Sequence, residues 1–254
     1  MLRFFDCDFG VGTTGFAYPA LTSPEEALAL MDRYAIEKAV VYDRGAHESG
    51  LFNRLDFILD FCRQNPRLLP SIPILPPATS EQPPPKELVD IIRRSGIKAV
   101  RACPTAHMFD FDVFAMGRLL EELQKYRIPV IHTSMGMQDH PWAHEPAWRD
   151  IREVALAFPR LPIIVVYTGM QQGRRLMTLL ETCPNVLTDL TCATFQFIEF
   201  VSERLGSNRL VLASHFPCDD PGLYTTWVNY CGLDESARRD VAFGNLERLL
   251  EGTR

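Results

Sequence analysis

The chain has 254 residues, of which 46% are hydrophobic and 23% are charged, and its net charge is −6. This length suits one large α/β domain or two small ones, and the apolar share is enough for a sizeable core. The acidic balance and the lack of a basic run exclude nucleic acid and anionic membranes as expected partners, and no stretch reaches the ~18 apolar residues of a membrane span.

The cysteines and the first residues bear on the cellular compartment. Seven cysteines are scattered without CxxC spacing, which predicts reduced, mostly buried thiols and excludes a Cys-rich zinc knuckle. Asp6 follows the first apolar residues too soon for a signal peptide. We therefore expect a cytoplasmic protein, and the sequence leaves a homo-oligomer open.

Short apolar runs recur along the chain, and most are followed by residues with helical spacing. We expect strands over residues 2–9, 38–43, 68–75, 97–102, 128–132, 161–167, 185–191 and 209–214. We expect helices over residues 24–34, 51–62, 86–94, 112–126, 145–158, 173–182 and 195–205, with two further pieces near 222–231 and 234–251. Ser23 and Asp234 are expected to cap helices, Ser23 in a capping box with Glu26.

The regular alternation of strand and helix predicts a parallel sheet in an α/β fold. Eight such units in ~250 residues are typical of a single-domain (β/α)8 TIM barrel that spans residues 1–254. An open doubly wound sheet is the alternative, and it would normally show a glycine-rich phosphate turn after the first strand. Residues 8–12 (DFGVG) contain GxG but lack the third glycine, which favours the barrel.

In a barrel, the side chains at the carboxyl ends of the strands converge on one mouth. The predicted strand ends carry Asp8, Gly10, Asp43, Arg44, Arg101, Cys103, His132, Tyr167, Asp189, Thr191 and His215. Carboxylates and imidazoles that meet at one point are what a divalent metal or an acid–base pair needs.

These strand ends resemble those of the amidohydrolase superfamily, in the amidohydrolase-related branch that includes aminocarboxymuconate-semialdehyde decarboxylase-like enzymes. The family's D-x-H-x-H-x-G corresponds to residues 6–12 (DCDFGVG), its strand-five histidine to His132, its H-x-G to residues 167–169 (YTG), and its G-S-D-x-P to residues 213–217 (ASHFP). A G-N-x-x-x-L pattern stands at residues 244–249. The resemblance covers the whole chain and implies a TIM barrel.

The departures from the family pattern fall on its metal ligands. Asp8 and Gly10 replace both first-strand histidines, Tyr167 replaces the sixth-strand histidine, and His215 replaces the eighth-strand aspartate. A binuclear site is thereby excluded. The resemblance leaves Asp8, His132 and His215 as the set for one divalent metal, with zinc the first choice and manganese or iron next. A metal-free mouth with a His215–Asp8 ion pair is the alternative.

Several other residues have roles that remain open at this point. Arg101 either binds a substrate carboxylate or pairs with Asp43 or Asp189, and Arg44 and Asp189 are further candidates for substrate contacts. Cys103 is a candidate nucleophile near His132 or His215, with a buried inert thiol favoured. Asp139, His140, Trp142 and His144 form a candidate lid, and a surface role is favoured for His47 and Glu48.

Two functions of different classes follow. The first is an amidohydrolase-like hydrolase, or a related decarboxylase, that acts on a small carboxylated molecule at the barrel mouth. Asp8, His132, His215 and Tyr167 would be its catalytic residues, with Tyr167 as a donor to a developing oxyanion. Gly10, which has no side chain, is expected to leave room for water or substrate. The second is a non-catalytic barrel that serves as a binding or assembly protein.

Overall fold

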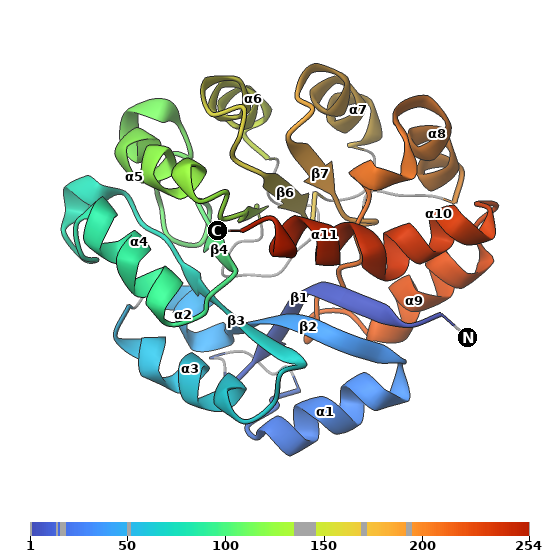
Figure 1. Ribbon diagram of the computed structural model, residues 1–254, viewed down its shortest axis with the longest axis horizontal. Helices are drawn as coiled ribbons and strands as arrows, with labels where there is room; N and C mark the ends of the chain where they lie inside the picture. The colour runs from blue at the N-terminus through green and yellow to red at the C-terminus, as the bar shows by residue number, and fades with distance from the viewer. Residues whose placement is uncertain are drawn as a thin grey trace.

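The computed structural model describes residues 2–13, 15, 19–49, 52–134, 146–168, 172–191 and 195–253. Seven parallel strands form one curled sheet in chain order, and helices surround it (Figure 1). The strands are β1 (Phe4–Val11), β2 (Ile36–Asp43), β3 (Leu68–Pro73), β4 (Ala99–Ala102), β5 (Val130–Thr133), β6 (Ile163–Val166) and β7 (Val186–Thr188). The α/β class and the parallel sheet that the strand–helix alternation predicts are therefore present.

The predicted eighth strand, residues 209–214, is not a strand of this sheet. Residues 210–216 instead form isolated parallel bridges to both edges, from Leu210 to Thr188 at β7 and from Leu212 to Asp6 in β1. A further isolated bridge joins Phe216 to Phe9, and between the bridges the backbone of His215 enters the left-handed region at φ 55°. The segment thus spans the two edges of the sheet without extending its ladder.

The helices follow the predicted order, with one addition. They are α1 (Pro24–Arg33), α2 (Arg44–Ser49), α3 (Leu55–Arg63), α4 (Pro85–Arg94), α5 (Val113–Lys125), α6 (Trp148–Ala157), α7 (Gly173–Thr182), α8 (Phe195–Leu205), α9 (Pro221–Tyr230), α10 (Glu235–Arg239) and α11 (Asn245–Glu251). Short 3-10 turns cover Phe52–Arg54, Pro77–Thr79 and Ser207–Arg209, and a π-helical turn at Asp240–Gly244 joins α10 to α11.

The predicted caps are present, and a further cap explains the helix that the sequence did not predict. Ser23 accepts a hydrogen bond from the backbone N–H of Glu26 within a capping box, and Asp234 caps α10. The sequence predicts no helix over residues 44–49, but the Asp43 carboxylate accepts the N–H groups of Gly45 and Ala46 at 3.1 and 3.2 Å. These bonds satisfy free donors of the first turn, so α2 forms directly after β2.

The sheet separates two hydrophobic clusters. The outer cluster lies between the strands and the surrounding helices, and the inner cluster contains Phe5, Val40 and Ile131 together with Leu246 and Leu250 of α11. Figure 1 shows α11 crossing one end of the sheet. The inner cluster includes Phe5, the second residue of β1, and Ala99, the first residue of β4, so α11 covers the amino ends of these strands.

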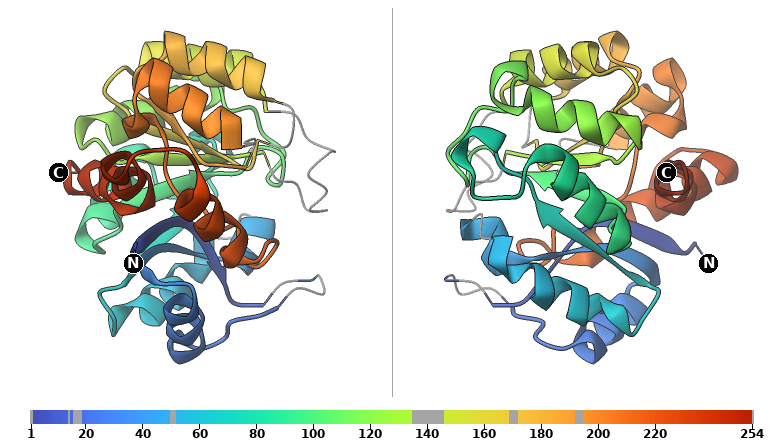
Figure 2. Two further views of the ribbon diagram at one scale, coloured as in Figure 1. Left: turned by 90° about the vertical axis from the view of Figure 1, so that its right-hand side faces the viewer. Right: turned by 60° about the vertical axis from the view of Figure 1, so that its left-hand side comes forward.

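The carboxyl ends of the strands therefore open on the opposite side, where α2 lies (Figure 2). The six described cysteines are free thiols, as the scattered spacing predicts, while Cys192 lies outside the described residues. No helix in the described part of the chain is long and apolar enough to cross a membrane.

Candidate active site

A row of four buried charged side chains lies at the carboxyl ends of the strands. Nη1 of Arg101 lies 2.7 Å from Oδ1 of Asp8, and Oδ2 of Asp8 lies 2.6 Å from Nδ1 of His215. Nε2 of His215 lies 2.6 Å from Oδ2 of Asp189. All four side chains are at most 1% exposed. The row alternates cation and anion, which allows full charges to be buried because each is paired.

An irregularity in β1 brings Asp8 into this row. The pairing register between β1 and β2 shifts between Asp6 and Phe9. Oδ1 of the buried Asp6 accepts the backbone N–H groups of Asp8 and Ser214, each at 2.9 Å. Asp6 thereby joins β1 to the 210–216 segment one residue before His215. Burial raises the pKa of Asp6 to about 6, although these hydrogen bonds oppose the rise.

The row holds His215 as an imidazolium. Burial by itself would lower its pKa, but the contacts with Asp189 and Asp8 outweigh burial and raise the pKa of His215 to about 10. Burial likewise opposes ionisation of Asp8, yet Arg101 and His215 hold the pKa of that carboxyl well below its usual range. At neutral pH the site therefore contains a protonated histidine and an ionised aspartate, a proton donor beside a weak base.

Two tyrosines surround the His215 ring. The ring of Tyr167 meets it edge-on with centroids 4.9 Å apart, and the ring of Tyr224 does so at 5.3 Å. The backbone N–H of Tyr167 donates to Oδ2 of Asp189 at 2.9 Å, and Thr191 donates to both carboxylate oxygens. These bonds orient the carboxylate that faces Nε2 of His215.

His132 does not lie in this site. Side chains alternate between the two faces of a strand, and Ile131 belongs to the inner cluster whereas Val130 belongs to the outer one. His132 shares the outer face with Val130, and its ring contacts Phe111 with centroids 5.0 Å apart. The expectation that His132 joins Asp8 and His215 at the mouth is therefore corrected. In the alternation of β5, the inward-facing position is that of Ile131, one residue before His132.

The predicted metal set does not assemble. Within the described residues, no group of three or more His, Cys, Asp and Glu side chains is arranged to hold a metal ion. His132 faces outward. Both ring nitrogens of His215 face carboxylates, and because the ring is protonated it has no free lone pair to donate to a metal. The guanidinium of Arg101 already neutralises Asp8. Among the described residues, the side chains at these strand ends therefore do not fit a divalent metal.

Gly10 does not leave a vacant space. A Cβ atom at Gly10 would lie 2.9 Å from both Cζ and the hydroxyl oxygen of Tyr42. Tyr42 therefore fills the room that was expected for water or substrate. Its ring also stacks under Arg101, whose Cζ lies 3.9 Å from the ring centroid. Tyr42 was missed from the sequence, although it shares the inward face of β2 with Val40.

The remaining candidates have other partners than expected. Cys103 lies 3.3 Å from Nδ1 of His47, rather than beside His132 or His215. His47 is 2% exposed, which corrects the surface role favoured for it. Arg44 is buried and contacts Glu48 and Cys218 at 3.4 and 3.5 Å.

The pairs considered for Arg101 are corrected as well. Asp43 pairs with Arg54 instead of Arg101, and Asp189 meets His215. The candidate lid residues Asp139, His140, Trp142 and His144 lie outside the described residues.

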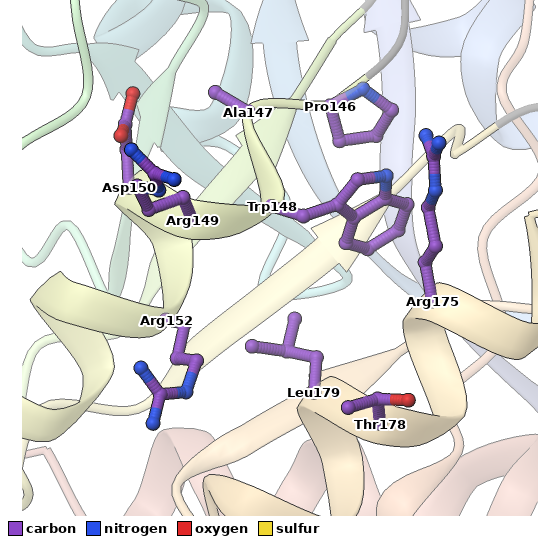
Figure 3. Close-up of a pocket in the computed structure, with 9 residues that line it drawn as sticks. All are labelled: Pro146, Ala147, Trp148, Arg149, Asp150, Arg152, Arg175, Thr178 and Leu179. Atoms are coloured by element: carbon purple, nitrogen blue, oxygen red, sulfur yellow. The ribbon is translucent and has the colours of Figure 1, made fainter.

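A separate groove of about 640 Å³ lies between α6 and α7 on the helical layer. Figure 3 shows Trp148 of α6 and Arg175 of α7 at its rim. It is lined by Pro146, Ala147, Trp148, Arg149, Asp150, Arg152, Arg175, Thr178 and Leu179. None of the predicted site residues is among them, so this groove is not the candidate site.

Solved structures similar to this chain share its fold. An uncharacterised TIM-barrel protein from Bordetella bronchiseptica is 18% identical, with 99% of each chain covered and a TM-score of 0.75. The 2,6-dihydroxybenzoate decarboxylase from Rhizobium is 16% identical, with 99% of each chain covered and a TM-score of 0.75. A dihydroxybenzoic acid decarboxylase from Polaromonas sp. JS666, with bound manganese and 2-nitroresorcinol, is 14% identical over 99% of this chain and 97% of that one, with a TM-score of 0.76.

No curated protein matches the sequence. The sequence model of the amidohydrolase family, however, matches residues 8–252. That range includes every strand end of the charged row and the closing helix, and it confirms the resemblance drawn from the motifs. The chain therefore belongs to the amidohydrolase family.

Proposed function

We propose that this chain is a single TIM-barrel domain that decarboxylates a small carboxylated, aromatic molecule without a metal, with His215 as the proton donor. The observation that carries the proposal is the imidazolium of His215 between Asp8 and Asp189. Hydrolysis needs a base that activates water, whereas decarboxylation needs an acid that protonates the substrate carbon. A protonated His215 beside a weakly basic Asp8 favours the second reaction.

Arg101 supplies the anchor for the substrate carboxylate. Its Nη1 contacts Asp8, while its Nε and Nη2 have no hydrogen-bond partner among the described residues. These two atoms form one edge of the guanidinium, which matches a carboxylate with two parallel hydrogen bonds. The substrate carboxylate would lie there while the carbon that carries it approaches His215.

In the proposed reaction, substrate entry opens the contact between Nε2 of His215 and Asp189. The bond between the substrate carbon and its carboxyl group breaks, and the electron pair stays on that carbon. The proton on Nε2 of His215 moves to the carbon, CO2 leaves, and the ring regains a proton from solvent. The rings of Tyr167 and Tyr224 provide apolar surroundings that favour the loss of charge as CO2 forms.

The decarboxylases among the similar structures support this reaction class, and the manganese in one of them marks the main difference from the proposal. The second function, a non-catalytic barrel, remains the outcome to which a negative result would lead. A non-catalytic barrel gains nothing from a buried, protonated histidine, because replacing such ion pairs by apolar residues is often neutral or stabilising.

The test is CO2 release from a panel of hydroxybenzoates in D2O, with the metal content of the same sample measured. We expect CO2 release that leaves one deuterium in the product and that a chelator does not change. The release should be lost in His215→Asn and retained in the outward-facing control His132→Gln. Hydrolysis products instead of CO2, or activity that needs added zinc, manganese or iron, would contradict the proposal. No turnover of any carboxylated substrate would favour the non-catalytic barrel.

A further inference from the structure

Three buried side chains, one in the charged row and two beside it, have hydrogen-bond donors that meet no acceptor in the described structure. They are the hydroxyl of Tyr42, Nε2 of His47, and Nε and Nη2 of Arg101. Each residue is at most 2% exposed. A buried donor without a partner is costly because it loses its hydrogen bond to water, so several at one place indicate that another molecule supplies the acceptors.

The three side chains are in contact with one another. Arg101 stacks on the Tyr42 ring at 3.9 Å, and the rings of Tyr42 and His47 lie 5.4 Å apart at their centroids. Tyr42 and His47 come from β2 and α2, and Arg101 from β4. Gly10 makes the arrangement feasible, because any side chain there would collide with the Tyr42 hydroxyl.

Cys103 determines which nitrogen of His47 carries the proton. Its sulfur lies 3.3 Å from Nδ1 of His47. Burial raises the pKa of the thiol to about 11, and burial together with Arg101 and Arg44 holds the pKa of His47 well below its usual range. Both groups are therefore neutral, and in the arrangement proposed below the thiol donates to Nδ1. The ring proton then sits on Nε2, which makes Nε2 a donor.

The donors are of one kind, which defines the ligand. A hydroxyl, a neutral imidazole N–H and a guanidinium edge all donate, whereas a cation would need acceptors. The nearest carboxylate, Asp8, is already engaged by Arg101 and His215. An oxyanion supplies the missing acceptors, and a planar carboxylate fits the two N–H groups of the guanidinium edge.

We infer that Tyr42, His47 and Arg101 form a carboxylate-binding pocket between β2 and β4, and that Cys103 is a positioning residue that keeps His47 in its Nε2–H form. The inference rests on the proposed function in taking the ligand to be a small carboxylated molecule. It adds the residues that distinguish a carboxylate from its neutral analogues, since an amide places an N–H against donors that need an acceptor.

The test is a titration of protein that carries 15N-labelled histidine, with the anions benzoate and 2,6-dihydroxybenzoate and with neutral benzamide. The His47 signals are assigned by their loss in His47→Gln. We expect the free protein to show Nε2–H at His47, and both anions, but not benzamide, to shift the Nε2 signal. Tyr42→Phe and His47→Gln, followed by calorimetry, should each bind benzoate roughly 3- to 10-fold more weakly.

Matched controls separate this pocket from general effects of mutation. Tyr126→Phe and His132→Gln remove the same groups elsewhere and should bind benzoate like the wild type. Cys103→Ala should mix the two His47 tautomers, and Cys103→Ser, which keeps a donor, should restore the Nε2–H form. Thermal unfolding of each variant confirms that it is folded.

The outcomes also separate the pocket from the proposed reaction. Benzoate that shifts His47 in a protein that releases no CO2 would support the pocket and contradict the decarboxylase. Failure of both anions to shift His47, or unchanged benzoate affinity in Tyr42→Phe and His47→Gln, would overturn the pocket even in an active enzyme.

Discussion

Nδ1 of His215 lies 2.6 Å from Oδ2 of Asp8, although 207 positions separate the two residues in the chain. The contact forms because the 210–216 segment returns to the edge of β1, where Asp6 binds the N–H groups of Asp8 and Ser214. It places an acid and its counter-ion where related folds carry chemistry. The predictions below test this contact and its neighbours.

Loss of the Asp8 charge should destabilise the protein strongly. Asp8→Asn leaves Arg101 and His215 buried without their shared carboxylate, and breaking a buried ion pair costs about 3–5 kcal/mol. Urea unfolding measures the change. The control is Asp32→Asn, which breaks the exposed pair of Asp32 with Arg67 and should cost less than about 1 kcal/mol. Equal losses of unfolding free energy in the two variants would show that the buried row stabilises the protein no more than an exposed ion pair does.

The stability of the protein should fall as pH rises above neutrality. The pKa of His215 is about 10 in the folded protein and about 6.5 in an unfolded chain. Protonated His215 therefore contributes its full stabilisation of the folded state below pH ~6.5. This stabilisation is lost as the pH rises to about 10, since only the folded state binds the proton in that interval. Unfolding free energies of the wild type and of His215→Asn should converge over this range. A constant difference would refute an imidazolium at this site.

Asp189 should set the pH range of the reaction. We expect the rate of CO2 release to fall as the pH rises through about 10, where His215 loses its proton. Asp189→Asn removes one of the two counter-ions of His215, so the pH at which the rate falls should be lower by roughly 1–3 units. The measurement is the pH profile of kcat. If the pH at which kcat falls is unchanged in this variant, a group other than His215 is responsible for the titration.

Arginine at position 101 should be needed for its shape as well as its charge. Arg101→Lys keeps a cation beside Asp8 but loses the two-donor edge. We expect benzoate to bind more weakly by about 1.5–3 kcal/mol, the contribution of a charge-assisted hydrogen bond. Titration calorimetry of the two proteins decides the matter. Equal affinity would remove Arg101 from substrate binding.

His132 should tolerate an apolar replacement. Both ring nitrogens lack hydrogen-bond partners in the described structure, and burial lowers the pKa of the ring to about 4. His132→Leu removes an unsatisfied polar group from beside Phe111, so we expect the unfolding free energy to be unchanged or raised by about 1 kcal/mol. The CO2-releasing activity should also be unchanged. Loss of activity with retained stability would return His132 to the site.

By itself, the sequence determined the class of fold and the family. Strand and helix periodicity depends on neighbours a few residues apart, and the motifs that frame the strand ends span the whole chain. Asp8, Arg101, Asp189 and His215 were recognisable as candidates because polar residues that end apolar runs are visible in one dimension.

Only the tertiary structure decided which candidates meet. A shift of one residue in a strand moves a side chain to the other face, so the outward orientation of His132 depends on the register of β5 with β4 and β6. The irregular pairing after Asp6 similarly brings Asp8 to His215. Tyr42 and His47 gain their roles from contacts with Arg101 and Cys103 on another strand end. Such contacts form when the sheet curls, and no local pattern encodes them.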